Sequence, residues 1–382
     1  MNFLIAPNAL KGSLSAADAA RIISKAIQEI LPDACCVLCP ISDGGNGTLE
    51  CLVQATGGKF YSASVCGPLV SMTVNARWGV LGDGTTAVIE MAEAAGLHLL
   101  KPCQYDAAHA TTFGVGELIR KAMNSGCKKI IVGMGGSATN DGGAGCARAL
   151  EIKFFDGNNM ELPDGGIHLS RLHHVIIKNE KLKIKGIEFV GLSDVTNVLC
   201  GPDGASFTFG AQKGATAEQM RVLDEALKHY AFIIENDLHR DVSHLPGSGA
   251  AGGLGVGLLA FCNAKILSGI DFVLDTLRFD DLLQQCDCVV AAEGTLDSQT
   301  LLGKGIEGVV RRAKKFDKPV HAFAGKVIGE KATLQGKLGL ATLHQISPDD
   351  VPIDEAIRNV KAFLSKGVRD HLSTKVAKDT KK

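Results

Sequence analysis

The sequence has almost no net charge, no long apolar run and no leader-like start. Its 382 residues include 40 Lys and Arg against 41 Asp and Glu, so the basic footprint of a nucleic-acid-binding protein is missing. No apolar stretch approaches the ~20 residues that cross a bilayer. The N-terminus lacks a charged segment, an apolar core and a cleavage site. These absences predict a cytoplasmic protein with neither a nucleic-acid nor a membrane partner.

Twelve cysteines are present, but their spacing lacks the pattern of a zinc site or a disulfide framework. The pair Cys36 and Cys39 lies within an apolar run, and no second pair or histidine couple accompanies it. In a strand, residues three apart point to opposite faces, so these two thiols do not share a metal easily. We interpret them as buried, reduced thiols that pack as small apolar side chains.

Several nucleotide and nucleophile motifs are also missing. No G-x-x-x-x-G-K-[ST] occurs, which excludes a Walker-type nucleotide site, and Ser137 does not lie in a G-x-S-x-G elbow. A formal G-x-G-x-x-G at Gly247, Gly249 and Gly252 follows Val242-Ser243-His244-Leu245-Pro246, which does not read as a strand. The dinucleotide motif of a nicotinamide dehydrogenase needs a strand before it, so the hypothesis of such an enzyme rests on this weak match alone.

Glycine is the residue in excess, with 45 copies against a usual share of ~7%. These glycines fall between apolar segments that alternate as strands and helices, and Ser15 with Asp18 marks one helix start. The alternation predicts an α/β fold with two domains. We expect a Rossmann-like parallel-sheet domain from residues 1–65 and 285–382, and a mixed α/β domain inserted at 66–284. The active site is expected in the cleft between them.

The most informative glycine-rich segment covers residues 133–143, Gly-Met-Gly-Gly-Ser-Ala-Thr-Asn-Asp-Gly-Gly. It follows an apolar strand at 130–132 and precedes a helix at 144. Glycines allow the backbone to approach a ligand closely, and a helix start presents free N–H groups to an anion. Ser137, Thr139 and Asp141 are side chains that bind phosphates, sugars or hydrated metals. The segment therefore predicts a phosphate site.

Four further segments mix glycine with polar residues, and each has a plain alternative. Lys11-Gly12-Ser13 follows the first strand, where α/β sheets bind ligands, but an exposed loop lysine is equally consistent. Residues 42–48 form a turn with more glycine than a turn needs. Residues 246–253 can present backbone N–H groups. Residues 293–305 combine carboxylates with lysine, as a magnesium–phosphate site or a salt-bridged loop does.

Together, these segments resemble the bacterial glycerate kinase family, over nearly the whole chain and in order. Ala6-Pro7-Asn8 with Lys11-Gly12-Ser13-Leu14-Ser15-Ala16 is similar to the family opening, and Asp43-Gly44-Gly45-x-Gly47-Thr48 to its second motif. The stretch from Gly135 to Gly143 matches throughout. The remaining matches are Asp194-Val195-Thr196-Asn197, Phe209-Gly210 with Gln212-Lys213-Gly214-Ala215, residues 246–253, and Glu293-Gly294 with Asp297, Gln299 and Gly303-Lys304.

Some positions depart from that resemblance. Asn8 stands where the family usually has aspartate, and Asn46 where it usually has glutamate. Ser42 replaces alanine, Val198 and Ala211 each replace a proline, and Gly305-Ile306 replaces a valine-proline pair. Two alternatives therefore stay open beside the family's own reaction. One is a kinase of another small hydroxy acid, and the other is a nucleotide-binding relative without catalysis.

The resemblance implies ATP-dependent, Mg²⁺-assisted phosphorylation of D-glycerate, with 2-phosphoglycerate as the expected product. Phosphoryl transfer depends on positioning and on stabilising charge. We therefore expect Asp194 to receive the proton of the substrate hydroxyl, with Asp43 as second candidate and Lys11 as a catalytic cation. Glu293 and Asp297 are the expected magnesium ligands. The expected substrate or phosphate contacts are Ser13, Gly44, Gly45, Ser137, Thr139, Asp141, Asn197, Lys213, Gly247, Gly249, Gly252, Gly253, Gln299 and Lys304. Assembly into homo-oligomers is not determined by these motifs.

Overall fold

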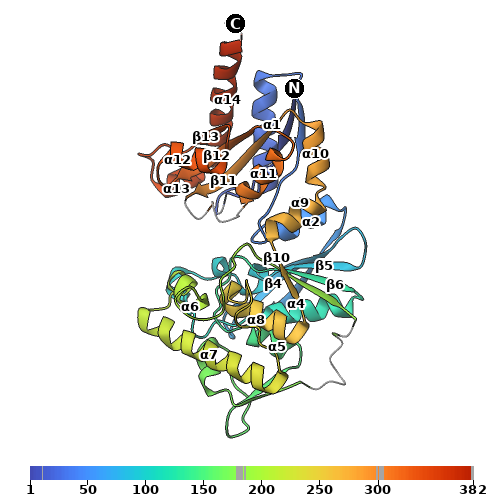
Figure 1. Cartoon of the computed structure of the whole chain (residues 1–382), viewed down its shortest axis with the longest axis vertical. Helices are drawn as coiled ribbons and strands as arrows, with labels where there is room; N and C mark the ends of the chain where they lie inside the picture. Colours follow the sequence, from blue (N-terminus) through green and yellow to red (C-terminus); the bar gives the residue numbers. More distant parts are fainter. Residues whose placement is uncertain (11, 178–183, 185, 298–299, 301–304, 380–382) are drawn as a thin grey trace. The chain divides into compact units, whose positions relative to one another are not determined.

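The computed structural model describes residues 1–10, 12–177, 184, 186–297, 300 and 305–379. The chain divides into two compact units, which are shown in Figure 1. Unit 1 contains Met1–Asp43 and Ile270–Lys382, and unit 2 contains Gly44–Gly269. The sequence placed these boundaries later, at residues 65 and 284. The segment after Asp43 belongs to unit 2 because its helix packs there: a Cβ on Gly79 would lie 2.4 Å from Val53 Cγ2.

Unit 1 is a five-stranded parallel sheet in the order β13-β12-β11-β1-β2. Alternate residues of β1, an interior strand of this sheet, enter two different cores. Phe3 and Ile5 pack with apolar residues of α1 and α14, whereas Leu4 packs in the core that includes Phe279 and Val309. The sheet is therefore covered on both faces. Its elements are β1 (Asn2–Ile5), α1 (Ala16–Ile30), β2 (Cys35–Leu38), α9 (Gly269–Thr276), α10 (Phe279–Gln285), β11 (Cys288–Leu296), α11 (Gly305–Lys314), β12 (Val320–Val327), α12 (Lys331–Leu338), β13 (Thr342–Gln345), α13 (Ile353–Arg358) and α14 (Val360–Asp379).

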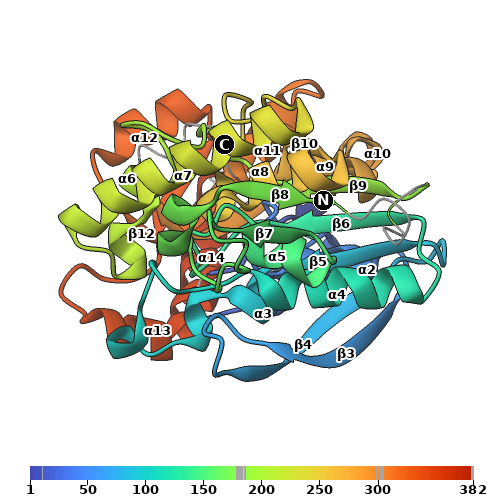
Figure 2. The ribbon, with the colours of Figure 1, turned by 90° about the horizontal axis from the view of Figure 1, so that it is seen from below.

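Unit 2 is a six-stranded mixed sheet in the order β10-β9-β6-β5-β4-β3, and Figure 2 shows its strands and helices from below. The pairs β3–β4 and β4–β5 are antiparallel, and the rest are parallel. Its elements are α2 (Thr48–Ala55), β3 (Lys59–Cys66), β4 (Thr73–Val80), β5 (Thr86–Glu90), α3 (Ala92–Ala95), α4 (Phe113–Asn124), β6 (Lys129–Gly133), α5 (Ala144–Ala149), β7 (Lys153–Phe155), β8 (His174–Ile176), β9 (Glu188–Leu192), α6 (Ala205–Phe209), α7 (Ala217–Leu238), α8 (Ala250–Cys262) and β10 (Lys265–Leu267).

This architecture confirms the predicted α/β fold, with a parallel sheet from both chain ends and a mixed sheet from the middle segment. The helix start at Ser15 is also as predicted, since its side chain accepts a hydrogen bond from the Asp18 N–H at 3.1 Å. None of the described helices has the length and apolar character needed to cross a membrane.

The thiols of β2 are less buried than the sequence indicated. All twelve cysteines are free. Cys39 is buried, as predicted, but Cys36 is only half-buried and Cys35 is exposed. The reason is that β2 is an edge strand, so an apolar run there does not imply burial on both faces.

Candidate active site

The predicted site loops of unit 2 leave the same edge of its sheet. In the parallel part, Glu90 of β5 pairs with Gly133 of β6, Gly133 pairs with Leu192 of β9, and Leu192 pairs with Leu267 of β10. These residues end their strands, so the segments that follow begin side by side. The carboxyl edge of parallel strands is where open α/β sheets bind ligands. The register therefore places the 133–143 segment beside the segment that contains Asp194.

Asp141 organises the 133–143 segment from inside the protein. Its carboxyl accepts hydrogen bonds from the N–H and hydroxyl of Thr112, each at 2.8 Å, and from the N–H groups of Gly143 and Gly145 at 3.1 and 3.2 Å. The residue is 1% exposed. Burial raises the pKa of this carboxyl, and the four hydrogen bonds act in the opposite direction. These contacts tie the segment to Thr112 and to the start of α5.

Lys213 brings a buried cation to the same segment. It ends a short 3-10 turn, Ala211–Lys213, and is 2% exposed. Its Nζ donates to the hydroxyl of Ser137 and to the carbonyl of Thr139, both at 2.8 Å. Burial lowers its pKa to about 7, although the nearby Asp141 acts to raise it. Because the Ser137 oxygen accepts from Nζ, the Ser137 proton is left to point elsewhere.

The glycines of residues 247–257 pack directly against the main chain of residues 139–143. Gly252 has φ +68°, and a Cβ there would lie 2.0 Å from the Thr139 carbonyl oxygen. The Gly142 N–H donates to the Gly252 carbonyl at 3.0 Å. A Cβ on Gly253 would lie 2.8 Å from the α-carbon of Gly142. The excess of glycine here is therefore explained by close backbone contact between two site segments.

Three other predicted residues adjoin these segments in unit 2. A Cβ on Gly135 would lie 2.4 Å from the α-carbon of Gly45, and the Gly44 carbonyl accepts from the Gly135 N–H at 3.4 Å. Asn197 donates to the Asp203 carbonyl at 2.7 Å, and its own carbonyl accepts from the Gly249 N–H at 3.0 Å. These contacts join the second motif to the third and the fourth motif to the sixth.

Asp194 follows β9 and is half-buried. Its Oδ1 accepts a hydrogen bond from the hydroxyl of Ser268 at 3.0 Å, and Ser268 directly follows β10. The pair fixes one oxygen of Asp194 at the carboxyl edge of the sheet.

Glu90 is a residue of this edge that the sequence did not single out. It is 6% exposed, and its Oε1 accepts a hydrogen bond from the N–H of Leu49 at 2.7 Å, in the first turn of α2. Burial raises its pKa to about 7. The signal in the sequence was a carboxylate that ends the apolar strand 87–90, in a position equivalent to Gly133.

Among the predicted residues of unit 1, Ser13, Asp43 and Asp297 follow strands, whereas Glu293 lies within β11. Ser13 donates to the Leu10 carbonyl at 2.8 Å, which fixes the turn after β1. Asp297 follows β11, and its Oδ1 accepts from the Thr300 N–H at 3.2 Å. Asp43 is the last residue of the first segment of the unit. The predictions for Lys11, Gln299 and Lys304 lie outside the described residues.

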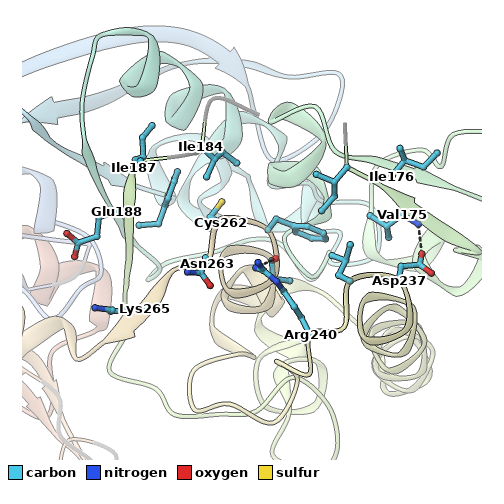
Figure 3. Close-up of a pocket in the computed structure, with 16 residues that line it drawn as sticks. Val175, Ile176, Ile184, Ile187, Glu188, Asp237, Arg240, Cys262, Asn263 and Lys265 are labelled. Atoms are coloured by element: carbon cyan, nitrogen blue, oxygen red, sulfur yellow. Dashed lines mark hydrogen bonds between the residues drawn. The ribbon is translucent and has the colours of Figure 1, made fainter. Parts of the chain in front are cut away.

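A cavity of about 900 Å³ lies elsewhere in unit 2 (Figure 3). Glu188 and Lys265, which line it, begin β9 and β10, whereas the site segments follow the ends of those strands. Two of its polar side chains bind the protein itself: Asp237 accepts from the Val175 N–H at 2.8 Å, and Arg240 donates to the Ala260 carbonyl at 2.6 Å. None of the predicted site residues that the structure describes lines it.

In unit 2, the α/β fold places glycine-rich loops at the carboxyl edge of the parallel part of the sheet, with a buried lysine behind them, an arrangement that suits an anionic ligand. Comparison with known proteins agrees. The sequence profile of the glycerate kinase family matches residues 3–374. Glycerate 2-kinase of Escherichia coli K12 is 42% identical over 381 residues, which cover 97% of this chain and 100% of that protein.

Two further comparisons extend over the whole chain. Glycerate kinase of Bacillus subtilis 168 is 40% identical over 379 residues, covering 99% of each chain. A crystal structure assigned as glycerate kinase 2 from Salmonella typhimurium LT2 matches with a TM-score of 0.83 and 40% identity, covering 100% of this chain and 99% of the other. The chain therefore belongs to the glycerate kinase family and is a glycerate kinase, a phosphotransferase that uses ATP.

Proposed function

We propose that the enzyme transfers the γ-phosphoryl group of Mg-ATP to the 2-hydroxyl of D-glycerate, in the cytoplasm, and releases 2-phosphoglycerate. The printed name of the Escherichia coli relative, a glycerate 2-kinase at 42% identity, supports the position of transfer. The observation that carries the phosphate chemistry is the buried Lys213, hydrogen-bonded to Ser137 and Thr139 of the glycine-rich segment.

A buried lysine behind a glycine-rich loop suits the electrostatic demand of phosphoryl transfer. Charge spreads over the outer oxygens of the transferred group, and fixed donors stabilise it most where water is excluded. Lys213 holds the Ser137 hydroxyl at 2.8 Å, so that hydroxyl can donate its proton to a phosphate oxygen. In this proposal Thr139, Asp141 and the glycines at 44, 45, 247, 249, 252 and 253 shape the phosphate loop.

Asp194 is our proposed acceptor of the proton from the 2-hydroxyl, with Asp43 as second candidate. Asp194 is half-buried at a strand end, and the Ser268 hydroxyl fixes its Oδ1. A general base needs a defined position before its pKa matters. Asn197, whose main chain and side chain both hold neighbouring loops, is proposed to position this segment against the substrate.

The proposed magnesium ligands, Glu293 and Asp297, suit an ion that is mostly bound by phosphates and water. They are four residues apart, and β11 is extended as far as Leu296, so about 13 Å separates their α-carbons. The two side chains therefore cannot both contact one ion directly. Within the described part of the chain, no cluster of three or more His, Cys, Asp or Glu side chains can hold a metal. Mg²⁺ typically takes one or two carboxylates together with substrate phosphates. Asp297, which is half-buried, is more accessible for that role than the buried Glu293.

The test is glycerate-dependent ADP release with Mg-ATP, followed by phosphorus NMR of the product. We expect 2-phosphoglycerate. Asp194→Asn should lower kcat by about 10²-fold or more, as expected for loss of a general base. Asp241→Asn, which changes an exposed carboxylate of the same unit, serves as the matched control and should leave kcat unchanged. A 3-phosphoglycerate product, or a fully active Asp194→Asn enzyme, contradicts the proposal.

A further inference from the structure

The N-cap of α2 has no side chain to accept the first N–H groups of the helix. It is Gly47, with φ +95°, and the N–H groups of a first helical turn find no partner within the helix. The acceptor comes from the end of β5 instead. Glu90 is 6% exposed, and its Oε1 accepts a hydrogen bond from the Leu49 N–H at 2.7 Å. The carboxyl group of Glu90 therefore ties the start of α2 to the carboxyl edge of the sheet.

The α2 loop, residues 44–48, lies directly on the glycine-rich segment that follows β6. A Cβ on Gly136 would lie 2.4 Å from the Oδ1 of Asn46. Glu90 adjoins the start of this segment as well, because it pairs with Gly133 in the sheet, and a Cβ on Gly133 would lie 3.8 Å from the Cγ of Glu90. One side chain thus lies beside the helix into which the α2 loop leads and beside the strand end from which the glycine-rich segment leaves.

The charge of Glu90 can change near neutral pH. Burial raises its pKa to about 7, and the main-chain N–H groups at the start of α2 act in the opposite direction. Two charged side chains also act on this pKa: Glu93 of α3 raises it, and Arg77 of β4 lowers it. These two form an ion pair at 2.8 Å, and Glu50 of α2 acts on Arg77. An ionised carboxylate accepts a hydrogen bond about twice as strong as a neutral acid does, so Glu90 should hold α2 more firmly once it has lost its proton.

We infer that Glu90 is a positioning residue of the reaction, which holds the α2 loop against the glycine-rich segment and does so more firmly as a carboxylate than as an acid. The inference rests on the proposed function, because that function assigns Gly44 and Gly45 of this loop to the substrate or its phosphate. Glu90 acts through these glycines, and its proton regulates how well the loop is held. Catalytic efficiency should therefore carry an ionisation that belongs to Glu90.

Glu90→Gln tests this role, since glutamine has the shape of the protonated acid and stays neutral at every pH. For both proteins, kcat/KM is measured for ATP and for D-glycerate at several pH values between 5.5 and 8.5. The ratio of wild type to variant cancels groups common to both proteins, Lys213 included. For at least one substrate, we expect a ratio near one at pH 5.5 that rises to about threefold to tenfold at pH 8.5. A ratio that does not change with pH contradicts the role of the charge.

Two further variants separate positioning from general damage. Asp237→Asn makes the same change at a carboxylate that accepts the Val175 N–H at 2.8 Å and lines the cavity in Figure 3. It should give a ratio near one at every pH. Glu90→Ala takes the acceptor away from the Leu49 N–H and should therefore be less active than Glu90→Gln throughout. Equal activity of the two Glu90 variants contradicts a positioning hydrogen bond. Thermal unfolding shows whether each variant retains its fold.

Hydrogen exchange of residues 44–55 tests the hold on the α2 loop without any substrate. At pH 8, Glu90→Gln should speed exchange at the start of α2 about threefold to tenfold, whereas Asp237→Asn should leave it unchanged. Unchanged exchange in Glu90→Gln overturns the inference, whatever the activity.

The outcomes separate the inference from the proposed function. Wild-type enzyme without glycerate-dependent ADP release overturns the proposed function, and hydrogen exchange then decides alone whether Glu90 holds the loop. Faster exchange in Glu90→Gln with a kinetic ratio near one at every pH shows that the α2 loop takes no part in the reaction, which overturns the proposed contacts of Gly44 and Gly45. Faster exchange together with a ratio that rises with pH supports the inference.

Discussion

Replacement of Lys213 by methionine tests the electrostatics of the phosphate loop most directly. Methionine has nearly the same length but no charge, so Lys213→Met removes the buried cation while it fills most of the space. In the native protein, burial lowers the pKa of Lys213 from 10.5 to about 7. The unfolded chain restores the ordinary value. Between these two pH values the unfolded state therefore binds more protons than the native state.

The sign of the effect follows from that difference. Stability rises with pH wherever the unfolded state binds more protons. A native pKa of about 7 against 10.5 means that Lys213 lowers the free energy of unfolding by about 4 kcal/mol at pH 7 and by about 2 kcal/mol at pH 9. The wild-type protein should therefore gain about 2 kcal/mol over this range relative to Lys213→Met, which has no such group.

The assay is urea denaturation of both proteins at several pH values between 6 and 9.5. Subtraction of the two curves removes groups common to both proteins, such as Glu90, whose pKa is raised to about 7. Lys265→Met, which removes an exposed lysine of the same unit, should run parallel to the wild type. If the Lys213→Met curve also runs parallel to the wild-type curve, burial does not lower the pKa of Lys213. The argument that this amine acts on phosphate from a site that excludes water is then refuted.

Three other predictions concern stability. Asp141→Ala should lower the free energy of unfolding by about 3–5 kcal/mol in urea denaturation, because four buried donors lose their acceptor; a loss below 1 kcal/mol would show that water replaces the carboxyl. Gly252→Ala should lower the thermal midpoint, since the new Cβ would lie 2.0 Å from the Thr139 carbonyl oxygen in a residue with φ +68°; an unchanged midpoint would contradict the backbone contact. Burial, with His371 nearby, lowers the pKa of His344 to about 4, so stability should fall as pH drops from about 6.5 towards 4, and His344→Phe should weaken that dependence in the same assay.

The periodicity of apolar residues and the positions of glycine were sufficient to predict the fold class. Strands that end in glycine-rich turns identified the carboxyl edge of unit 2, and the parallel register placed Gly133 and Asp194 at that edge. The burial of β2 was not predictable, because an apolar run carries no information about whether a strand is central or at an edge. Sheet order depends on contacts between segments that are distant in the sequence.

The partners of individual side chains were harder to predict from the sequence than their places in the motifs. Asp141 was singled out as a polar residue in a phosphate loop, yet its partners include Thr112, 29 residues away in the sequence. Glu90 was overlooked because it ends an ordinary apolar strand, and its partner Leu49 is 41 residues away. A sequence motif shows which residue types gather, but the atoms that they face are set by tertiary contacts.

The backbone contact between residues 139–143 and the glycines near 252 limits how this enzyme can change during evolution. Where two segments meet through side chains, a substitution in one can be compensated by a smaller or larger residue in the other. Here Gly252 and Gly253 meet the main chain around Thr139 and Gly142, which no substitution can shrink. Changes in substrate preference are therefore expected to arise in residues around this contact, while the contact itself stays glycine.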